Sequence, residues 1–267
     1  MTSLKSKPLL RVEGLTKTYL SGQWWEKRVA VNALDRVNLT LEPGETLALV
    51  GKSGSGKTTL AMCVAMLEKP DSGKIFFDGQ DVLALQTPKR TLLRPRIQLI
   101  FQDSAAALPA RFSAAQIIEE PLAIRRRCSA KERSHLALDL MEKVGLPPGW
   151  ANRRPHQFSG GERQRLAIAR SLALLPSLLI LDEPFTGLDL SIRAQIVNLL
   201  LALQADLSLT FLYISHDLDL IQHFSDHVAV MDRGRIVEHA SVADLFRDPQ
   251  HVATQALLAC GSAYSHG

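Results

Sequence analysis

The 267-residue chain is poor in cysteine and aromatic residues, and it has no long uninterrupted apolar run. Its three cysteines, Cys63, Cys128 and Cys260, lie far apart and form no Cys-x2-Cys pair. This spacing argues against a disulfide framework and against a zinc site, and it fits a reducing compartment. No run approaches the ~18 apolar residues that span a bilayer, and the N-terminus lacks the apolar stretch of a secretory signal. We therefore expect any role at a membrane to come through a partner.

Composition places the chain among ordinary globular proteins. Hydrophobic residues make up 46% and charged residues 22% of the sequence, which is typical of a folded domain. The length suffices for one large α/β domain, or for a core with a smaller subdomain. The net charge of +4 is modest and does not by itself indicate nucleic acid. The basic run Arg125-Arg126-Arg127 is interpreted as a solvated face beside a helix.

The most informative feature is the segment 51–58, which reads Gly-Lys-Ser-Gly-Ser-Gly-Lys-Thr and matches the pattern Gly-x4-Gly-Lys-Thr. Apolar residues 47–50 precede it and a helix-like segment follows it, so a mere flexible Gly/Ser turn is disfavoured. Glycines let the backbone curl so that successive N–H groups, and the next helix N-terminus, point at a polyphosphate. Lys57 is expected to reach the β- and γ-phosphates, and the Thr58 hydroxyl to ligate Mg²⁺. The residues expected to bind the nucleotide here are Gly51, Ser53, Gly54, Ser55, Gly56, Lys57, Thr58 and Thr59.

Two acids, Asp182 and Glu183, follow a fully apolar strand predicted over residues 178–181. A continuous apolar run fits a central parallel strand, and ligands gather at the carboxyl ends of such strands. Asp182 is then placed to hold the Mg²⁺ shell, directly or through water. Glu183 is placed to take a proton from, or to orient, an attacking water. Because two acids are also common at the start of solvated loops, this interpretation depends on the phosphate loop.

A weaker anion-facing helix start is predicted at Ser159-Gly160-Gly161-Glu162. Ser159 caps the following helix, and Glu162 completes a capping box. The two glycines would also expose amides to a second anion. A helix dipole contributes only about 0.3–1 kcal/mol toward a surface anion, so this turn is expected to be an auxiliary clamp. One chain does not obviously bring both sites to a single nucleotide, whereas a symmetric pair of chains could.

The order of expected elements indicates an α/β fold with a mainly parallel sheet, an antiparallel β patch near the N-terminus and a helical insertion at approximately 103–175. Ser129-x-x-Glu132 predicts a capping box that opens a helix, and Gly145 closes that helix. Residues 21–28 are interpreted as an exposed turn or hairpin tip. The remaining predicted elements are strands near 10–15, 37–41, 74–77, 97–101 and 210–214, a helix over 192–203, a hairpin over 228–237 and two short helices over 242–260.

Residues 158–165, Phe-Ser-Gly-Gly-Glu-Arg-Gln-Arg, resemble the signature sequence of ATP-binding cassette (ABC) ATPases, usually Leu/Phe-Ser-Gly-Gly-Gln. Residues 51–58 resemble the Walker A loop of that family, and Asp182 with Glu183 resemble Walker B and the catalytic glutamate. The other ordered matches are Tyr19 to the aromatic that stacks on adenine, Gln102 to the glutamine loop, Asp189 to the D-loop and His216 to the switch histidine. The resemblance covers nearly the whole chain. It implies a single P-loop NTPase (RecA-like) domain over residues 1–267, with a short helical tail at approximately 241–267.

The resemblance implies that two such domains close head-to-tail and enclose two Mg-ATP between Walker A of one and the signature of the other. Glu183 would polarise water, and His216 would hold the γ-phosphate and the attacking water. Gln102 would sense Mg²⁺ and link the site to the helical insertion. The signature residues and the D-loop would complete the nucleotide site, through Ser159, Gly160, Gly161 and Asp189. Without the resemblance, Tyr19 would be interpreted as an ordinary exposed or core aromatic residue. His216 would be interpreted as an ordinary surface histidine.

Two positions depart from the family pattern. Glu162 replaces the usual Gln of the signature, and Gly187 replaces the common Ala before Leu188-Asp189. An acid at position 162 could repel a neighbouring triphosphate if it faced it. As a capping-box partner it faces its own helix, so we expect activity to survive.

Residues 100–104, 117–122 and 248–258 resemble segments of the ATPases of dipeptide, oligopeptide and nickel importers. The resemblance implies an ATP-hydrolysing subunit of a bacterial importer for peptides or nickel, peripheral on the cytoplasmic face of the inner membrane. Expected partners are a second ATPase subunit, by preference a different chain, two permease subunits and a periplasmic or extracellular solute-binding protein, and no nucleic acid. Changes at residues 109–111 and 251–254 leave the substrate open. The tail lacks the cysteine cluster of some relatives, so no iron–sulfur cluster is expected.

Two alternatives stay open at this point. A non-transport ABC ATPase acting on DNA or ribosomes would generally carry long coiled-coil insertions or two cassettes in tandem, and the sequence has neither. A subunit that mainly holds ATP while its partner turns over is disfavoured by intact Glu183 and His216. The changes at Glu162 and Gly187 keep that second alternative open.

Overall fold

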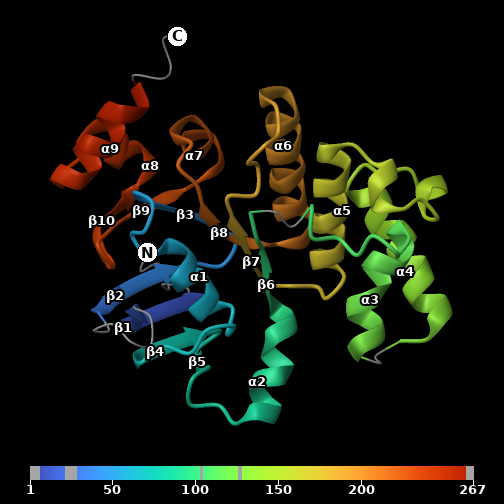
Figure 1. Ribbon diagram of the computed structural model, residues 1–267, viewed down its shortest axis with the longest axis horizontal. Helices are drawn as coiled ribbons and strands as arrows, with labels where there is room; N and C mark the ends of the chain where they lie inside the picture. Colours follow the sequence, from blue (N-terminus) through green and yellow to red (C-terminus); the bar gives the residue numbers. More distant parts are fainter. Residues whose placement is uncertain (1–6, 22–28, 103–104, 126–127, 263–267) are drawn as a thin grey trace, which may run out of the picture. The chain divides into compact units, whose positions relative to one another are not determined.

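The computed structural model describes residues 7–21, 29–102, 105–125 and 128–262, which form two compact units (Figure 1). The first unit comprises Met1–Arg94 and Thr210–Gly267, and the second comprises Pro95–Leu209. Residues 22–28 of the expected hairpin tip lie outside the described residues, as do residues 103–104 of the subfamily match and residues 126–127 of the basic run.

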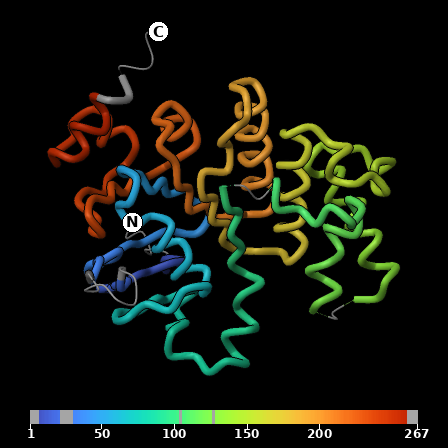
Figure 2. Tube along the Cα trace, viewed as in Figure 1, coloured from blue at the N-terminus to red at the C-terminus, as the bar shows by residue number. Residues whose placement is uncertain are grey.

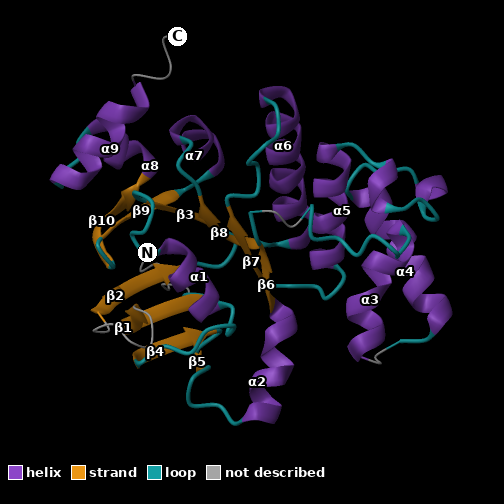
Figure 3. Ribbon diagram, viewed as in Figure 1, coloured by secondary structure: helices purple, strands orange, loops and turns teal. Residues whose placement is uncertain are grey.

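One sheet of the first unit is antiparallel and has the strand order β2-β1-β4-β5 (Figure 3). Its strands are β1 (Leu10–Ser21), β2 (Val29–Leu41), β4 (Ser72–Phe77) and β5 (Gln80–Asp81). The two sets of apolar residues that predicted β1 and β2 face each other, with a shift in register between Val12 and Leu15. Leu10 pairs with Leu41, Val12 with Leu39 and Leu15 with Val37, and all six side chains are buried. Such cross-strand pairs stabilise a sheet, and the predicted strands are confirmed.

The second sheet of the first unit joins segments from both ends of the chain (Figure 2). Strand β3 (Thr46–Val50) lies parallel between β8 (Thr210–Ile214) and β9 (His227–Asp232). Strand β10 (Arg235–Ser241) pairs antiparallel with β9, which confirms the predicted hairpin. All residues of β3 and β8 are buried, as expected for parallel strands covered on both faces.

Three short helices follow strands of the first unit, and the sequence predicted only the first of them. Helix α1 (Lys57–Val64) follows β3, α2 (Thr87–Leu93) follows β5 and α7 (Leu218–Phe224) follows β8. Phe224 of α7 packs 5.4 Å from Phe211 and 5.1 Å from Tyr213, measured between ring centroids. Helices α2 and α7 are too short to show a helical period, so apolar periodicity could not predict them.

The second unit combines a parallel strand pair with most of the longer helices. Strands β6 (Ile97–Ile100) and β7 (Leu178–Asp182) pair in parallel. The helices are α3 (Ala114–Arg125), α4 (Ala130–Lys143), α5 (Gly160–Leu172) and α6 (Leu190–Leu207), with 3-10 turns at Arg94–Arg96, Pro148–Trp150 and Pro155–Gln157. The helical insertion at approximately 103–175 and the single-domain boundaries remain predictions. The expected α/β class, with parallel pairs and an N-terminal antiparallel sheet, is confirmed.

The capping box predicted at Ser129 is also present. The Ser129 N–H donates to Glu132 Oε2 at 2.7 Å, and the Glu132 N–H donates to Ser129 Oγ at 3.3 Å. At the other end of α4, Gly145 adopts a φ of +72°. Glycine tolerates this left-handed conformation, which commonly ends a helix. Both ends of this helix were therefore predicted correctly.

Helix α6 qualifies the expectation that no segment is apolar enough for a membrane. Within the described part of the chain it is the one helix, 18 residues long, that meets the length and composition criteria for a span. It carries Arg193 and Asp206, and four of its side chains, Ile196, Val197, Leu200 and Leu203, are buried in the protein. One such helix is weak support for a span, because the core helix of a globular domain meets the same criteria.

Two short C-terminal helices, α8 (Val242–Arg247) and α9 (Val252–Ser262), confirm the predicted pair. Glu238 of β10 fixes the start of α9. Its carboxylate accepts the backbone N–H groups of Gln250 and His251, both at 2.9 Å, and the Thr254 hydroxyl at 2.5 Å. Burial alone would raise the pKa of Glu238, but these three hydrogen bonds outweigh it and hold the pKa below its ordinary value.

We predict that Glu238→Ala lowers the free energy of unfolding by about 1.5 kcal/mol at pH 7, since hydrogen bonds to a charged group are lost. Because the folded-state pKa is lowered, this contribution is fully present above the ordinary glutamate pKa of about 4.3 and disappears as pH falls through the lowered value. Urea unfolding and amide exchange at residues 250–254 measure the effect. Glu142→Ala, at an exposed position of α4, is the control. An equal loss at pH 3 would contradict the prediction.

Candidate nucleotide-binding site

The segment 51–58 forms a tight loop between β3 and α1. Gly51, Gly54 and Gly56 have φ values of +149°, +75° and +108°, a region that only glycine enters without strain. A Cβ on Gly51 would lie 2.1 Å from the Met231 carbonyl oxygen, and one on Gly56 would lie 2.2 Å from that of Ala33. Both contacts are with backbone atoms and cannot be relieved by a rotamer change. Two of the loop glycines are therefore required by close packing as well as by conformation.

Lys57 begins α1 and is only 8% exposed. Its ammonium group donates to the carbonyl oxygens of Gly51 at 2.8 Å and of Lys52 at 3.0 Å. A buried ammonium requires such partners. These two hydrogen bonds hold the ammonium group of Lys57 next to the backbone of the loop.

The loop residues fit a polyphosphate ligand. The left-handed glycines form the kind of curled backbone that turns successive N–H groups toward an anion. The Ser55 hydroxyl is buried and has no hydrogen-bond partner in the structure, as expected for a group that a ligand oxygen would satisfy. Ser53 and Thr58 are exposed at the same turn, and Thr59 is partly exposed.

His216 lies at the same edge of the sheet as the loop. Leu49 of β3 pairs in parallel with Ile214 of β8, so the loop and His216 both follow the carboxyl ends of neighbouring strands. His216 is exposed. The next residue, Asp217, accepts the Leu220 N–H at 3.2 Å and caps α7. The cap fixes the turn that presents the histidine.

Tyr19 lies on β1 with 37% of the residue exposed. The Lys17 ammonium lies over its ring, 5.2 Å from the centroid. Lys17 was not predicted from the sequence, although its spacing of two residues from Tyr19 on a strand was a usable signal. The carbonyl groups of Ala33 and Met231 were not predicted either, because side-chain identity carries no signal for them.

In the second unit, the parallel register brings Gln102 and the two acids to one edge. Ile100 of β6 pairs with Leu181 of β7, so Gln102 and Asp182 follow neighbouring strand ends. Asp182 is 6% exposed, whereas Gln102 is exposed. Glu183 has a φ of +46°. A left-handed non-glycine residue of this kind is strained, and such residues cluster at functional sites.

The helix start at Ser159 has the predicted capping box. The Ser159 N–H donates to Glu162 Oε2 at 2.7 Å, and the Glu162 N–H donates to Ser159 Oγ at 3.3 Å. The Glu162 carboxylate therefore turns back to its own helix end, as expected.

The signature glycines pack closely on the start of α6. A Cβ on Gly161 would lie 2.6 Å from Ile192 Cγ2, and one on Gly160 would lie 3.3 Å from Leu188 Cδ2. Asp189 caps α6 by accepting the Ile192 N–H at 3.0 Å and the Ser191 hydroxyl at 2.7 Å. Both hydrogen bonds lower the pKa of Asp189, and the bond from the Ile192 N–H has the larger effect. The signature and the D-loop are thus adjacent within this unit.

No group of three or more His, Cys, Asp or Glu side chains among the described residues could hold a metal ion. This result is compatible with the expected Mg²⁺ ligands, Thr58, Gln102 and Asp182. Magnesium typically binds through one or two carboxylates, several waters and the phosphates of its substrate, without a dedicated protein cage.

A family model described as "ABC transporter" matches residues 34–186. The dipeptide transport ATP-binding protein DppF of Haemophilus influenzae is 44% identical over 255 residues, which are 95% of this chain and 78% of that protein. The DppF protein of Escherichia coli is 45% identical over 94% of this chain and 76% of its own length. The oligopeptide transport ATP-binding protein AppF of Bacillus subtilis is 42% identical over 97% and 79%.

Solved structures agree with the family match. The dimeric post-hydrolysis cassette MJ0796 bound to ADP and Pi has a TM-score of 0.76 and 30% identity, and the match covers 87% of this chain and 98% of that one. The cbiO1 protein of Clostridium perfringens, part of the ABC transporter complex cbiONQ, has a TM-score of 0.79 and 27% identity over 97% and 100%. Fold and phosphate loop together define a P-loop ATPase cassette. The chain belongs to the ABC transporter family, and it is an ATPase coupled to transport.

We predict that Gly56→Ala abolishes ATP binding and lowers the free energy of unfolding by about 2–4 kcal/mol, through the backbone clash and the left-handed strain. Gly54→Ala is the matched control, because its Cβ would enter open space at a similarly positive φ. The free energy of unfolding of Gly54→Ala should fall by only about 1–2 kcal/mol. Thermal unfolding and calorimetric titration with ATP measure both effects. A Gly56→Ala protein with unaltered ATP affinity would refute the packing argument.

We also predict that Glu162→Gln leaves ATP turnover in the assembled transporter within about threefold, less than about 0.7 kcal/mol in activation energy. The reason is that Gln also completes a capping box. Glu162→Ala, which removes the box, should instead cost about 1 kcal/mol of stability. A steady-state phosphate-release assay is the measurement. An ATP turnover more than about tenfold higher in Glu162→Gln than in the wild type would show that the Glu162 carboxylate repels the triphosphate.

Proposed function

We propose that this chain is the ATP-hydrolysing subunit of a bacterial importer for peptides. The observation that carries the proposal is its 42–45% identity, over at least 94% of its length, to proteins described as dipeptide and oligopeptide transport ATP-binding proteins. Nickel, the other substrate considered from the sequence, has no support among these relatives. Peptides are therefore the favoured substrate.

The roles that we propose for the first unit draw on the geometry of the loop and on the resemblance to ABC ATPases. The curled loop and Lys57 would bind the triphosphate, with Ser53, Gly54, Ser55, Gly56, Thr58 and Thr59 supplying backbone and hydroxyl groups. Tyr19 would stack on the adenine ring. His216, at the same sheet edge as the loop, would hold the γ-phosphate and the attacking water.

The roles proposed for the second unit concern hydrolysis and the partner subunit. Glu183 would accept the proton of the attacking water as its oxygen approaches the γ-phosphorus. Asp182, Gln102 and Thr58 of the first unit would hold Mg²⁺. A bound Mg²⁺ neutralises charge on the phosphate oxygens. The signature turn, Ser159, Gly160 and Gly161, with Asp189 close by, would contact a nucleotide held by a second subunit.

We propose a head-to-tail pairing with a second ATPase subunit, of the same or a different chain. The similarity to the dimeric cassette MJ0796 supports such a pairing. Two permease subunits would anchor the pair at the cytoplasmic face of the inner membrane, and a solute-binding protein would deliver the peptide. The similarity to cbiO1, part of a transporter complex, supports assembly with membrane partners.

We predict that Glu183→Gln reduces ATP turnover of the reconstituted transporter at least about 100-fold, the usual minimum for loss of a general base. ATP affinity should stay within about threefold, because the amide keeps the shape of the side chain and removes only its basicity. Phosphate release and nucleotide binding are measured in the same preparation. Glu142→Gln, at an exposed site on α4, is the control. Wild-type turnover in Glu183→Gln would show that this subunit's glutamate does not act as the base.

A further inference from the structure

Lys17 lies at the centre of a polar cluster beside the aromatic ring of Tyr19. Its ammonium group lies 2.5 Å from Glu68 Oε1, 2.8 Å from the carbonyl oxygen of Lys69 and 3.9 Å from Asp71 Oδ1. It also lies over the Tyr19 ring at 5.2 Å. Only 12% of the Lys17 side chain is exposed. A long lysine side chain with so many fixed contacts is unusual at a sheet surface, where such side chains generally extend into water.

The cluster connects the strand of Tyr19 to the end of the helix that starts at the phosphate loop. Helix α1 begins at Lys57, and the chain turns directly after it. The N–H groups of Leu67 and Glu68 both donate to the Met62 carbonyl oxygen, at 2.9 and 3.2 Å. Glu68 is therefore fixed to the last turn of α1. Its bond to Lys17 joins that helix to β1.

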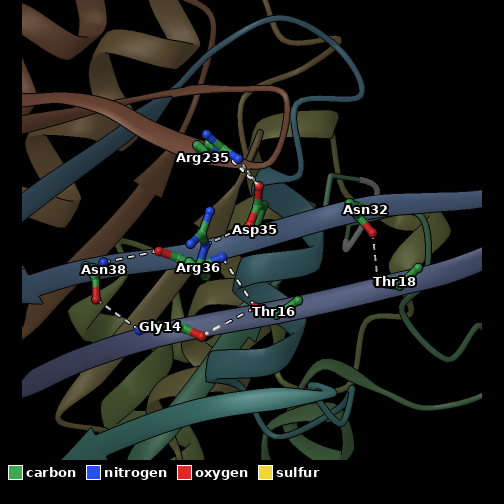
Figure 4. Close-up of polar contacts among 8 residues, drawn as sticks. All are labelled: Gly14, Thr16, Thr18, Asn32, Asp35, Arg36, Asn38 and Arg235. Carbon is green, nitrogen blue, oxygen red and sulfur yellow. Dashed lines mark hydrogen bonds and ion pairs between the residues drawn. The ribbon is translucent and has the colours of Figure 1, made fainter.

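The backbone around Lys17 is held on both edges of β1. On one edge the Thr18 hydroxyl donates to Asn32 Oδ1 at 2.9 Å, and the Arg36 N–H donates to the Thr16 hydroxyl at 3.3 Å (Figure 4). On the other edge the Thr18 N–H donates to Asp71 Oδ2 at 2.7 Å, and the Asp71 N–H donates to the Thr16 carbonyl oxygen at 2.8 Å.

These bonds surround a shift in register between Lys17 and Thr18 in the pairing with β2. An irregular stretch of strand is thus held by side-chain hydrogen bonds together with a backbone one. These bonds fix the backbone on either side of Lys17, and the contact with the Lys17 ammonium holds the Tyr19 ring.

We propose that Lys17 is a positioning residue for the nucleotide base: it covers one face of the Tyr19 ring and leaves the opposite face for adenine. This proposal rests on the nucleotide function proposed above, and on the assignment of Tyr19 to the base. Two physical effects favour it. The ammonium holds the ring in one orientation before ATP arrives, which reduces the ordering cost of binding. It also attracts the π electrons of the ring.

The charge needed for this contact is secured by the same cluster. The hydrogen bond that the Lys17 ammonium donates to Glu68 is the largest of the effects that raise the pKa of Lys17, and it exceeds the opposing effect of burial. The side chain therefore stays positively charged at neutral pH. Lys57 holds the phosphate end of the nucleotide site, and Lys17 holds its base end. The two act on different parts of the ligand.

The test separates the base from the phosphates by comparing Mg-ATP with magnesium tripolyphosphate, which has no base. Binding of both to the full chain is measured by calorimetry for Lys17→Met, Lys17→Arg, Tyr19→Ala and the double variant Lys17→Met/Tyr19→Ala. Lys74→Met, an exposed lysine on neighbouring strand β4, is the control. Thermal unfolding is recorded for every variant. If Lys17→Met does not fold, Glu68→Gln takes its place, since it removes the partner that holds the ammonium.

We expect Lys17→Met to weaken ATP binding about threefold to tenfold, the range of a partly desolvated cation–π contact. Tripolyphosphate affinity should not change. Lys17→Arg should restore ATP binding to within about twofold, because a guanidinium also stacks on an aromatic face. In the Tyr19→Ala background the Lys17→Met change should have less than about a twofold effect, since the ring through which it acts is missing.

Three results would overturn the proposal. Equal weakening of ATP and tripolyphosphate would place Lys17 in general support of α1. Unchanged ATP affinity in Lys17→Met would show that the contact does not act on binding. Normal ATP affinity in Tyr19→Ala would remove the base contact through which Lys17 acts. Failure of the wild-type chain to bind either ligand would instead refute the proposed nucleotide function itself.

Discussion

The nucleotide site depends on a junction where three backbone segments meet without room for side chains. The phosphate loop contributes Gly56, β2 contributes Ala33, and the turn between β9 and β10 contributes Gly234. A Cβ on Gly56 would lie 2.2 Å from the Ala33 carbonyl oxygen, and one on Gly234 would lie 3.1 Å from the same atom. The Gly234 N–H donates to the Ser55 carbonyl oxygen at 2.9 Å. The loop is thus held by elements of both sheets of the first unit.

This junction explains how a loop with so little side-chain mass keeps one conformation. The atoms that approach the loop glycines most closely belong to backbone carbonyl groups, which cannot move aside by a change of rotamer. The curled conformation of the loop is therefore set before any ligand binds. Preorganised groups cost little reorganisation when charge arrives. Lys57 follows the same principle, because carbonyl oxygens of Gly51 and Lys52 fix its ammonium group. Lys17 has the equivalent arrangement beyond the far end of α1, where Glu68 and the Lys69 carbonyl hold it. One lysine is therefore fixed at the start of this helix, and a second, on β1, is fixed by residues that follow its end.

The sequence predicted an element well when the residues that determine the element lie close together in the chain. Strands β1 and β2 were predicted by their alternating apolar residues, and the capping boxes at Ser129 and Ser159 by side chains three residues apart. Each of these signals lies within a few residues of its effect. Helix α7 was missed because its main determinants are a single cap, Asp217, and the packing of Phe224 on β8. Short helices are stabilised mostly by such tertiary contacts.

The residues of the nucleotide site also fall into those that local sequence predicts and those that it does not. Motif spacing identified the loop, the acids and the signature turn. The parallel registers of β3 with β8 and of β6 with β7 then explain why His216 shares an edge with the loop, and Gln102 with Asp182. The carbonyl groups of Ala33 and Met231 could not be found in this way, because every residue has a carbonyl group. Which of them meets the loop is decided by long-range strand placement.

The two departures from the family pattern are each accommodated by local structure. Glu162 uses its carboxylate in the capping box of α5, so its charge is directed at the helix N-terminus that it stabilises. Gly187 has a φ of +78°, with no atom within 4 Å of the place of a Cβ. An alanine there would meet no steric contact but would be strained, so in this chain glycine suits the turn that leads to Leu188. Neither change disturbs Asp189, which keeps its cap on α6. The substitutions that kept an ATP-holding subunit open therefore have structural explanations that require no loss of hydrolysis.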